Sequence, residues 1–254
     1  MNRELRLLAI ISAVCVAVIV MQQPLQAATN ESTCAQFGVF SVDAGNYNVQ
    51  NNAFNLRGRG QQCLFADSAG TDWSETTTNS VRTGSPGGYP SIYAGCHWGD
   101  CSSNQHGMPI LESSITSVPT AWSVTPSTSG KWDISYDIWF NTTPTTNACP
   151  NGLEIMVWLN EAGPRPAGSQ VATVIINNMT WQVWFGTGGC GSDVSYMATT
   201  PVNSVNFDLL PFFRDAVSRG YLNPSWYLID VEAGTEIWTP GSNFRTNSFS
   251  VSVQ

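Results

Sequence analysis

The sequence predicts an all-β domain in which two antiparallel sheets pack face to face, and two observations lead to this prediction. Short runs of alternating apolar and polar residues recur between residues 37 and 205, separated by clusters of Gly, Pro, Asn and Ser. This spacing is typical of a β-sandwich or barrel. In the longest runs one parity is branched or aromatic and the other is polar, so each strand has a core face and an open face.

The run 132–140 is the clearest strand. Its expected core face holds five large apolar residues: Trp132, Ile134, Tyr136, Ile138 and Phe140. Its expected open face holds Asp133, Ser135, Asp137 and Trp139. The run 154–160 repeats the pattern, with Ile155, Val157 and Leu159 on one parity and Glu154, Met156, Trp158 and Asn160 on the other. A sheet of such strands leaves a curved polar and aromatic face open to a ligand.

A hairpin and one helix follow. The runs 171–176 and 181–185 read as two strands joined at Asn177-Asn178, a favoured pair for a tight turn. Asp208 is a good helix N-cap, Pro211 fits the first turn, and Gly220 ends the helix. The helix has an apolar stripe formed by Leu209, Phe212, Phe213, Ala216 and Val217. We expect Arg214 and Arg219 to form its solvated face.

The last predicted strand spans residues 227–238. Ile229 and Val231 are expected to face the core, and Gly234 suggests a bend or a close backbone approach. The opposite parity holds three acids and a tryptophan: Asp230, Glu232, Glu236 and Trp238. This strand therefore has the same two-faced design as the runs at 132–140 and 154–160.

The first 28 residues read as a secretory signal peptide. Arg3 and Arg6 precede an apolar run from Leu7 to Met21, and Ala27 and Ala28 offer small residues for cleavage. The apolar run is shorter than the roughly 20 residues of a membrane span, although an uncleaved anchor is the alternative. Residues 29–254 suit one secreted, extracellular all-β domain.

Six cysteines lie outside the predicted signal, an even number that implies disulfides in an exported protein. Cys96 and Cys101 are expected to pair locally. Among the 15 connectivities that six cysteines allow, the preferred remainder is Cys34 with Cys63 and Cys149 with Cys190. A metal site formed by Cys96, His97 and Cys101, with His106 nearby, is the alternative; it is disfavoured because no familiar four-ligand spacing is completed.

Composition narrows the class of partner. Only 11% of residues are charged, against roughly 25% in an average soluble domain, and the formal net charge is −8. Nucleic acids and anionic membrane surfaces both require basic patches, so neither is an expected partner. Few charges together with many Trp, Asn, Gln, Ser and Thr residues suit a neutral polyhydroxylated ligand.

Acids on the open faces suggest the chemistry. Asp137, Glu154, Glu232 and Glu236 share this parity, and Lys and Arg are nearly absent from their strands. Two carboxyl groups across a sugar-sized cleft are what glycoside hydrolysis needs. The alternatives are acids that merely solubilise a sheet face, or a carbohydrate-binding protein without catalysis. With only His97 and His106 available, a Ser-His-Asp triad has few candidate bases.

The sequence resembles the family 12 glycoside hydrolases, which are secreted endo-β-1,4-glucanases with a β-jelly-roll fold. Two motifs carry most of the resemblance, Glu154-Ile155-Met156-Val157-Trp158 and Glu232-Ala233-Gly234-Thr235-Glu236. Further matches lie at residues 51–52, 89–99, 136–139, 163–169, 207–220 and 226–238. The resemblance implies a sandwich of two curved antiparallel sheets with one α-helix and an open substrate cleft.

The resemblance also implies roles for individual residues. Glu154 matches the nucleophile of a retaining mechanism, Glu236 matches the general acid and base, and Asp137 matches the aspartate that orients and tunes the nucleophile. The implied substrate contacts are Asn52, Phe54, Trp98, Met156, Trp158, Pro166 and Glu232. Pro166 lies in a segment, 163–169, that matches a loop over one end of the cleft.

We therefore expect a monomeric endo-β-1,4-glucanase without cofactor or metal, acting on a β-1,4-glucan such as cellulose through a glycosyl-Glu154 intermediate. The alternative substrates are xyloglucan and mixed-linkage glucan. One departure affects this choice. The family usually reads Asn-Asn-x-Trp-Gly, whereas this chain reads Asn51-Asn52-Ala53-Phe54-Asn55, followed by Arg57 and Arg59. Phe54 offers a smaller stacking platform than Trp, weaker by about 1 kcal/mol.

Overall fold

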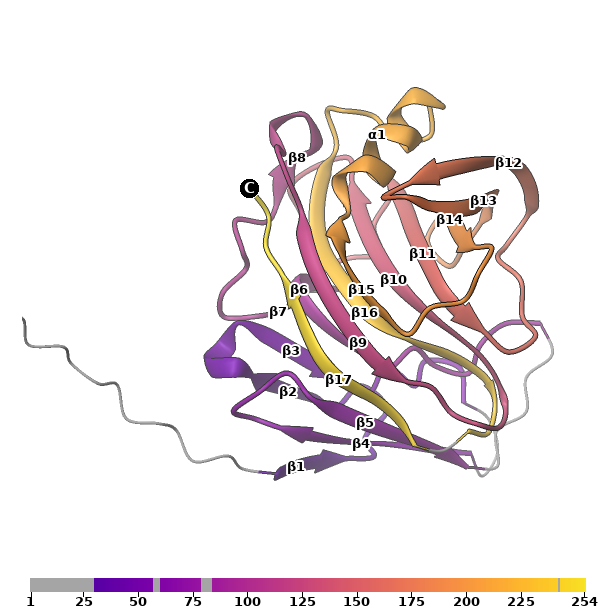
Figure 1. The fold of residues 1–254 in the computed structure, drawn as a ribbon. Coiled ribbons are helices and arrows are strands. Elements are labelled where there is room, and N and C mark those ends of the chain that lie inside the picture. Colours follow the sequence, from indigo (N-terminus) through magenta and orange to yellow (C-terminus); the bar gives the residue numbers. More distant parts are fainter. Residues whose placement is uncertain (1–29, 57–59, 79–83, 242) are drawn as a thin grey trace, which may run out of the picture.

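A computed structural model describes residues 30–56, 60–78, 84–241 and 243–254, and these form two large sheets with one α-helix (Figure 1). The all-β prediction is confirmed, and the fold is a β-jelly roll. The predicted signal peptide, Arg57 and Arg59 lie outside the described residues. Within the described ranges no helix has the length and apolar character needed to cross a membrane.

The smaller sheet has six strands. Its order is β1 (Asn30–Thr33), β4 (Gln61–Asp67), β5 (Trp73–Thr78), β17 (Phe244–Val251), β9 (Pro119–Thr125) and β15 (Ser204–Asp208). Strand β17 corrects the prediction that the strand ending near residue 238 is the last one. Its sequence alternates only weakly because Arg245, Asn247 and Ser248 stand among its apolar residues.

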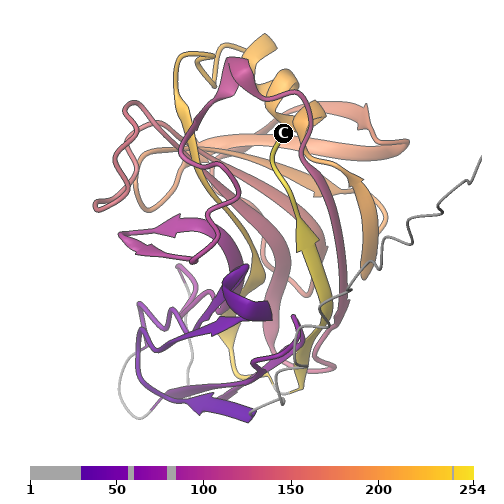
Figure 2. The same cartoon turned by 90° about the vertical axis from the view of Figure 1, so that its left-hand side faces the viewer.

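The larger sheet carries the open face. Its order is β12 (Ser169–Ile176), β13 (Met179–Thr187), β14 (Ser192–Ala198), β11 (Leu153–Glu161), β10 (Lys131–Asn141), β16 (Tyr227–Thr239), β6 (Ser91–His97), β3 (Tyr47–Gln50) and β2 (Val39–Val42). The short strands β7 (Asp100–Cys101) and β8 (Ile110–Leu111) pair with β6 and β16. Among the described strands, β11 and β14 form the single parallel pair. Both sheets are strongly curved (Figure 2).

The core fills the space between the sheets. All five residues of the predicted apolar face of β10 lie in it, as do Ile155, Val157 and Leu159 of β11. Burying a large apolar side chain stabilises the fold by ~1.5–3 kcal/mol. The two-faced strand pattern therefore fixes which side of the larger sheet packs against the smaller sheet. The acidic residues lie on its opposite side.

The helix α1 (Leu210–Ser218) closes one end of this core. Phe212 and Phe213 are fully buried, and their rings pack edge-on against Trp181 and Phe140, with centroids 5.1 Å apart in both pairs. Asp208 Oδ1 accepts hydrogen bonds from the backbone N–H groups of Leu210 and Val118, each at 2.8 Å. The N-cap is Leu209 rather than the predicted Asp208. The Asp208 side chain nevertheless accepts a hydrogen bond from the first N–H group of the helix and holds the segment before β9.

The arginines of this helix are paired rather than simply solvated, which corrects the prediction. Arg214 forms an ion pair of 2.6 Å with Glu112, whose side chain is fully buried. Arg219 forms an ion pair of 2.6 Å with Asp215 one turn earlier. A buried carboxylate needs such a partner, because leaving it unpaired would cost several kcal/mol.

The prediction of the β12–β13 turn is confirmed, whereas that of the core residue at the start of β16 is wrong. The β12–β13 hairpin turns at Asn177 and Asn178 with φ of 52° and 60°, so the predicted tight turn is confirmed. At the start of β16, Trp139 pairs with Asp230 and Phe140 with Leu228, so Ile229 is the extra residue of a β-bulge. Leu228 rather than Ile229 therefore joins the core at this end.

Three disulfides join Cys34 to Cys63, Cys96 to Cys101 and Cys149 to Cys190. The preferred connectivity is confirmed. The alternative metal site at Cys96 and Cys101 is excluded, because both sulfur atoms are used in one disulfide. The Cys149–Cys190 bridge ties the β13–β14 loop to the segment that precedes β11.

Candidate active site

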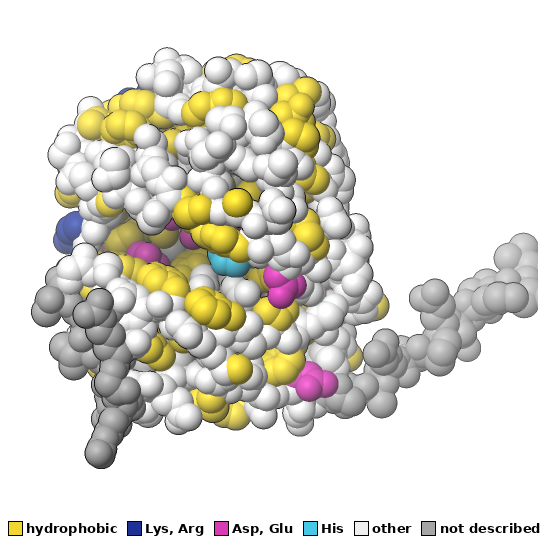
Figure 3. All heavy atoms as spheres, turned by 180° about the vertical axis from the view of Figure 1, so that it is seen from behind, with side chains coloured by type: hydrophobic (Ala, Val, Ile, Leu, Met, Phe, Trp, Pro, Cys, Tyr) yellow, Lys and Arg dark blue, Asp and Glu magenta, His cyan; other side chains and the backbone are white. Residues whose placement is uncertain are grey.

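The open face of the larger sheet lines a cleft of about 1030 Å³. Figure 3 shows acidic and histidine side chains in this hollow, bordered by hydrophobic ones. The floor comes from β10, β11 and β16 and consists of Asp137, Trp139, Glu154, Met156, Trp158, Glu236 and Trp238. The walls come from loops far apart in the sequence. The predicted open cleft is therefore present.

Glu154 lies on β11 at the base of the cleft, with 8% of its surface exposed. The loop between β13 and β14 presses against it. A Cβ atom added to Gly188 would lie 2.5 Å from Glu154 Oε2, so only glycine fits there without displacing the carboxyl group. Cys190, two residues further on, is held by the disulfide to Cys149. The fold thus fixes the space around this carboxyl group.

Asp137 on β10 is the carboxyl partner of Glu154. The two residues are diagonal neighbours, because Asp137 pairs with Met156 and Trp139 with Glu154. Burial, followed by the charge on Asp137, raises the pKa of Glu154 well above its usual range. Burial, followed by the charges on Glu232 and Asp230, does the same to the pKa of Asp137. A hydrogen bond joins the two carboxyl groups, so one of them holds a proton.

Asp133 plays the corresponding part for Glu236. These two residues are direct register partners on β10 and β16. Asp133 is fully buried, and its Oδ1 accepts a hydrogen bond of 2.7 Å from Ser135 Oγ. Burial raises the pKa of Asp133 to about 7. Burial, followed by the charge on Asp133, raises the pKa of Glu236 well above its usual range.

Sequence reasoning placed Asp133 on the open face but gave it no role. The available signal was its parity, which it shares with Asp137 four residues later. Strand β10 therefore supplies one aspartate to each of the two glutamates that line the cleft, Asp137 at the cleft surface and Asp133 buried beneath it.

Curvature brings the two pairs into one site. Glu154 lies opposite Trp139 and Glu236 opposite Asp133, six residues apart along β10. On a flat strand this offset would span roughly 20 Å. In the curved sheet the charge on Glu236 raises the pKa of Glu154, and the charge on Asp193 of β14 acts on both. The carboxyl groups thus converge on the concave side.

Aromatic and sulfur-containing side chains line the same cleft as the acids. Trp98, Phe54 and Phe37 are large hydrophobic residues that remain exposed, and all three line the cleft. Met156, Trp158 and Trp238 pack together with Met197. Exposed aromatic faces next to carboxyl groups offer platforms on which sugar rings can stack. Sequence reasoning missed Phe37, which precedes the first strand of the larger sheet and carries no motif.

Most of the predicted substrate contacts line the cleft: Asn52, Phe54, Trp98, Met156 and Trp158. Two do not. Pro166 is buried, whereas its neighbours Arg165 and Ala167 face the cleft. Glu232 has the predicted parity but no exposed surface, since it is hydrogen-bonded to Ser91 and His97. The prediction that Glu232 touches substrate is therefore corrected.

Comparisons with known proteins agree with this geometry. Residues 45–254 match the family described as Glycosyl hydrolase family 12. Endoglucanase S of Pectobacterium parmentieri is 30% identical, over 76% of this chain and 76% of that protein. Endoglucanase cel12A from Rhodothermus marinus superposes with a TM-score of 0.83 at 38% identity, covering 88% of this chain and 99% of that one. A family 12 xyloglucanase from Bacillus licheniformis gives 0.80 at 26% identity, with coverages of 89% and 100%.

Proposed function

Because the chain belongs to glycosyl hydrolase family 12 and is an endo-β-1,4-glucanase, we propose that it cleaves its substrate with retention of configuration, with Glu154 as nucleophile and Glu236 as general acid and base. The observation that carries this proposal is that Glu154 and Glu236 line one cleft and that each has an aspartate of β10 beside it. Retention requires the two glutamate carboxyl groups to lie about 5–5.5 Å apart when substrate is bound.

The first step forms a glycosyl-enzyme. The Glu154 carboxylate attacks the anomeric carbon while Glu236 donates its proton to the leaving glycosidic oxygen. In the second step Glu236, now a carboxylate, takes a proton from water, and the water oxygen displaces Glu154 from the anomeric carbon. Two displacements at the same carbon restore the original configuration.

Proton placement follows from the two pairs. Glu236 must be protonated at the start, and the raised pKa of its buried carboxyl group meets that need. Glu154 must be ionised, so the proton of the Asp137–Glu154 hydrogen bond has to reside on Asp137. Asp137 then donates to Glu154 and orients it toward the sugar. Each aspartate thus supports a different protonation state of its glutamate.

The cleft supports binding to the interior of a glucan chain. Four of the aromatic residues that line it are Phe54, Trp98, Trp158 and Trp238, and such residues offer several platforms for successive sugar rings. We propose soluble or amorphous β-1,4-glucan as the substrate. Because one structural relative is named a xyloglucanase, initial rates on carboxymethylcellulose, xyloglucan and mixed-linkage glucan should be compared.

We also propose that the enzyme is secreted as a monomer, with residues 1–28 as its signal peptide and 29–254 as the catalytic domain. The basic and apolar pattern of the first 28 residues and the three disulfides support export. Amino-terminal sequencing of the exported protein would locate the cleavage site, which we expect after Ala27 or Ala28.

The nucleophile assignment is tested by Glu154→Gln, which keeps the shape of the side chain and removes its charge. We expect release of reducing ends from carboxymethylcellulose to be abolished while glucan binding survives. Glu75→Gln, at a buried glutamate of the smaller sheet, is the matched control and should keep activity. Full activity of Glu154→Gln would refute the assignment.

The two glutamates can also be told apart chemically. In Glu154→Ala, azide should occupy the space of the missing carboxylate and yield an α-glycosyl azide from an aryl β-glycoside with a good leaving group. In Glu236→Ala, azide should instead attack the glycosyl-enzyme and yield the β-product. The opposite pattern would exchange the two roles.

A further inference from the structure

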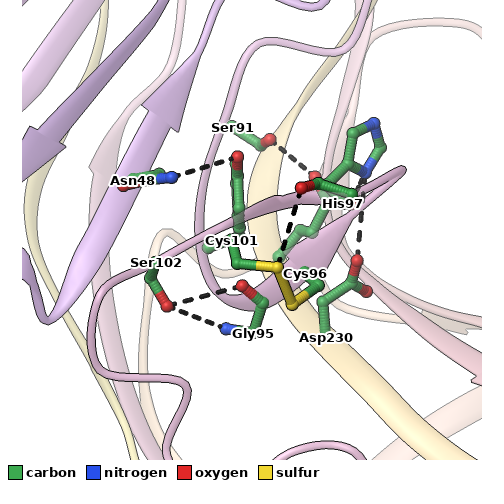
Figure 4. A network of polar contacts seen from close by, with 11 residues as sticks. Asn48, Ser91, Gly95, Cys96, His97, Cys101, Ser102 and Asp230 are labelled. Atoms are coloured by element: carbon green, nitrogen blue, oxygen red, sulfur yellow. Dashed lines mark hydrogen bonds and ion pairs between the residues drawn. A yellow bond between two sulfur atoms is a disulfide. The ribbon is translucent and has the colours of Figure 1, made fainter. Parts of the chain in front are cut away.

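A second cluster of ionisable side chains lies next to the proposed site, on the side of β6. It consists of His97, Asp230 and Glu232, whose ligand atoms lie within 4.8 Å of one another. All three residues are buried, and Glu232 and Asp230 have at most 1% of their surfaces exposed. Figure 4 shows His97 facing Asp230, with Ser91 close by. The proposed mechanism gives this cluster no role.

Glu232 is held from both ends of its carboxyl group. Its Oε2 accepts a hydrogen bond of 2.7 Å from Ser91 Oγ. Its Oε1 lies 2.5 Å from His97 Nδ1, close enough for a short charge-assisted hydrogen bond. Both oxygens of this buried carboxyl group therefore have a hydrogen-bond partner, which fixes the position of Glu232 in the interior.

This carboxyl group lies beside Asp137. Glu232 and Asp137 are direct register partners on β16 and β10, and Glu154 is on β11 at the far side of Asp137. The charge on Glu232 is, after burial, the largest influence that raises the pKa of Asp137. The main influences on the pKa of Glu154 are instead burial and the charges on Asp137, Asp193 and Glu236. Within the Asp137–Glu154 pair, the charge on Glu232 therefore acts mainly on Asp137.

The other ionisable groups around the Asp137–Glu154 pair do not cancel the stronger effect of Glu232 on Asp137. Asp137 also faces Asp230 and Glu236, and Glu154 also faces Asp193 and Glu236. Burial raises the pKa of Asp193 to about 7 and that of Asp230 and Glu236 well above the usual range. The raised pKa values favour the neutral forms of these three groups, so they oppose the effect of the Glu232 charge on Asp137 only weakly.

We propose that His97 and Glu232 form a positioning pair whose negative end holds the shared proton on Asp137 and thereby keeps Glu154 ionised for attack. This inference rests on the proposed function, because it presumes that Glu154 is the nucleophile. His97 supplies the hydrogen bond that holds the Glu232 carboxyl group beside Asp137. Neither residue has to touch the reacting atoms.

A metal ion is a poorer occupant of the same cluster. Ligands that share one zinc ion at about 2.0–2.2 Å each lie roughly 3 Å or more apart. The 2.5 Å between His97 Nδ1 and Glu232 Oε1 suits a proton between them and leaves no room for a cation. The spacing therefore favours a hydrogen-bonded pair.

Glu232→Gln tests the proposal, because it removes the charge and keeps the contact with Ser91. We expect the acidic limb of the kcat/KM profile to move to lower pH by about one unit, since a like charge within ~4–6 Å shifts a pKa by that order. We expect kcat at the optimum to fall about tenfold, as the proton moves toward Glu154. KM should stay unchanged, because Glu232 has no exposed surface.

The matched control is Glu75→Gln, a fully buried glutamate of β5 whose change should leave the pH profile in place. His97→Asn keeps a donor near the Nδ1 position without the imidazole charge. If the pair acts as a unit, the double variant His97→Asn/Glu232→Gln should be no slower than the worse single variant. Fully additive losses would overturn the pairing.

Three further outcomes distinguish the positioning proposal from a failure of the proposed function and from a metal site. If Glu154→Gln is inactive and Glu232→Gln has the native pH profile, the positioning proposal fails and the proposed function stands. If Glu154→Gln is active, the proposed function fails first. If a chelator inactivates the native enzyme and Zn²⁺ restores it, but not in Glu232→Gln, the cluster is a metal site and the proposal is overturned.

Discussion

At the scale of single residues, the chemistry depends on which carboxyl group keeps a proton. Asp133 and Asp137 lie four residues apart on β10 and serve Glu236 and Glu154 respectively. The proposed mechanism needs opposite outcomes in the two pairs. Asp133 helps its glutamate to keep a proton, whereas Asp137 has to keep the proton itself and leave its glutamate charged. The neighbours of the two pairs differ, because Glu232 lies beside Asp137.

Asp133→Asn should move the basic limb of the kcat/KM profile to lower pH by about one unit. The charge on Asp133 raises the pKa of Glu236, so removing that charge lets the general acid lose its proton earlier. The measurement is kcat/KM against pH on a soluble glucan. Asp72→Asn, at an ion pair with Arg245 in the smaller sheet, is the control. An unmoved basic limb would show that Asp133 does not act on Glu236.

At the scale of elements, the β13–β14 loop is a wall of the site. Its residues Thr187, Gly188, Gly189 and Cys190 line the cleft, and the disulfide to Cys149 holds it. Gly188 lies so close to Glu154 Oε2 that no side chain fits. A loop that is distant in sequence thus limits the positions open to the Glu154 carboxyl group.

Gly188→Ala should lower kcat by about a hundredfold with little loss of stability. The added methyl group forces the Glu154 carboxyl group to move, and a misplacement of about 1 Å at a reacting group costs that much. Steady-state kinetics and a thermal melt measure the two effects. Gly189→Ala is the matched change, and its loss should be far smaller because its Cβ would meet nothing within 4 Å. Equal losses would contradict the steric argument.

At the scale of the whole molecule, the buried acids couple folding to pH. Burial raises the pKa of Glu75 to about 8 and those of Asp133 and Asp193 to about 7. In the unfolded chain these groups titrate near pH 4, so between the two values the folded state holds protons that the unfolded state lacks. Stability is therefore greatest at low pH and falls as the pH rises to about 8.

We expect the midpoint of thermal unfolding to decrease steadily between about pH 5 and pH 8. Each such group contributes a slope of up to about 1.4 kcal/mol per pH unit. Glu75→Gln should make this slope shallower by that amount, because glutamine has no proton to lose. Urea titrations at several pH values measure it. If the free energy of unfolding rose from pH 5 to pH 8 instead, burial would not disfavour the charged forms of these acids.

Several features of the fold could be predicted because they are written in local patterns. The parity of β10 and β11 separated core from cleft, the Asn177-Asn178 pair marked the hairpin, and Asp208 and Gly220 bounded the helix. Strand β17 could not be found in this way, because its residues alternate weakly and its pairing with β5 and β9 is long-range. The partners of Arg214 and Arg219 were missed in part for the same reason, since Glu112 is distant in sequence.

In the candidate site, too, local motifs predicted some residues, and others became apparent only from the folded structure. The motifs around Glu154 and Glu236, with their resemblance to a known family, were enough to identify the acids and most cleft residues. Phe37 and Gly188 could not be identified, because each matters only through a neighbour brought close by folding. Glu232 was assigned the correct face, yet His97 and Ser91 cover it, which parity alone cannot show.

The sequence by itself determined an all-β chain with two-faced strands and acids on the open face, and it predicted the observed pairing of the six cysteines outside the predicted signal peptide. Only the tertiary structure decided which acids face each other, which of them lie beneath the cleft surface and how closely the β13–β14 loop approaches Glu154. The physical reason is that local alternation fixes the direction of a side chain. Its partners, its burial and hence its protonation depend on curvature and register between strands distant in sequence.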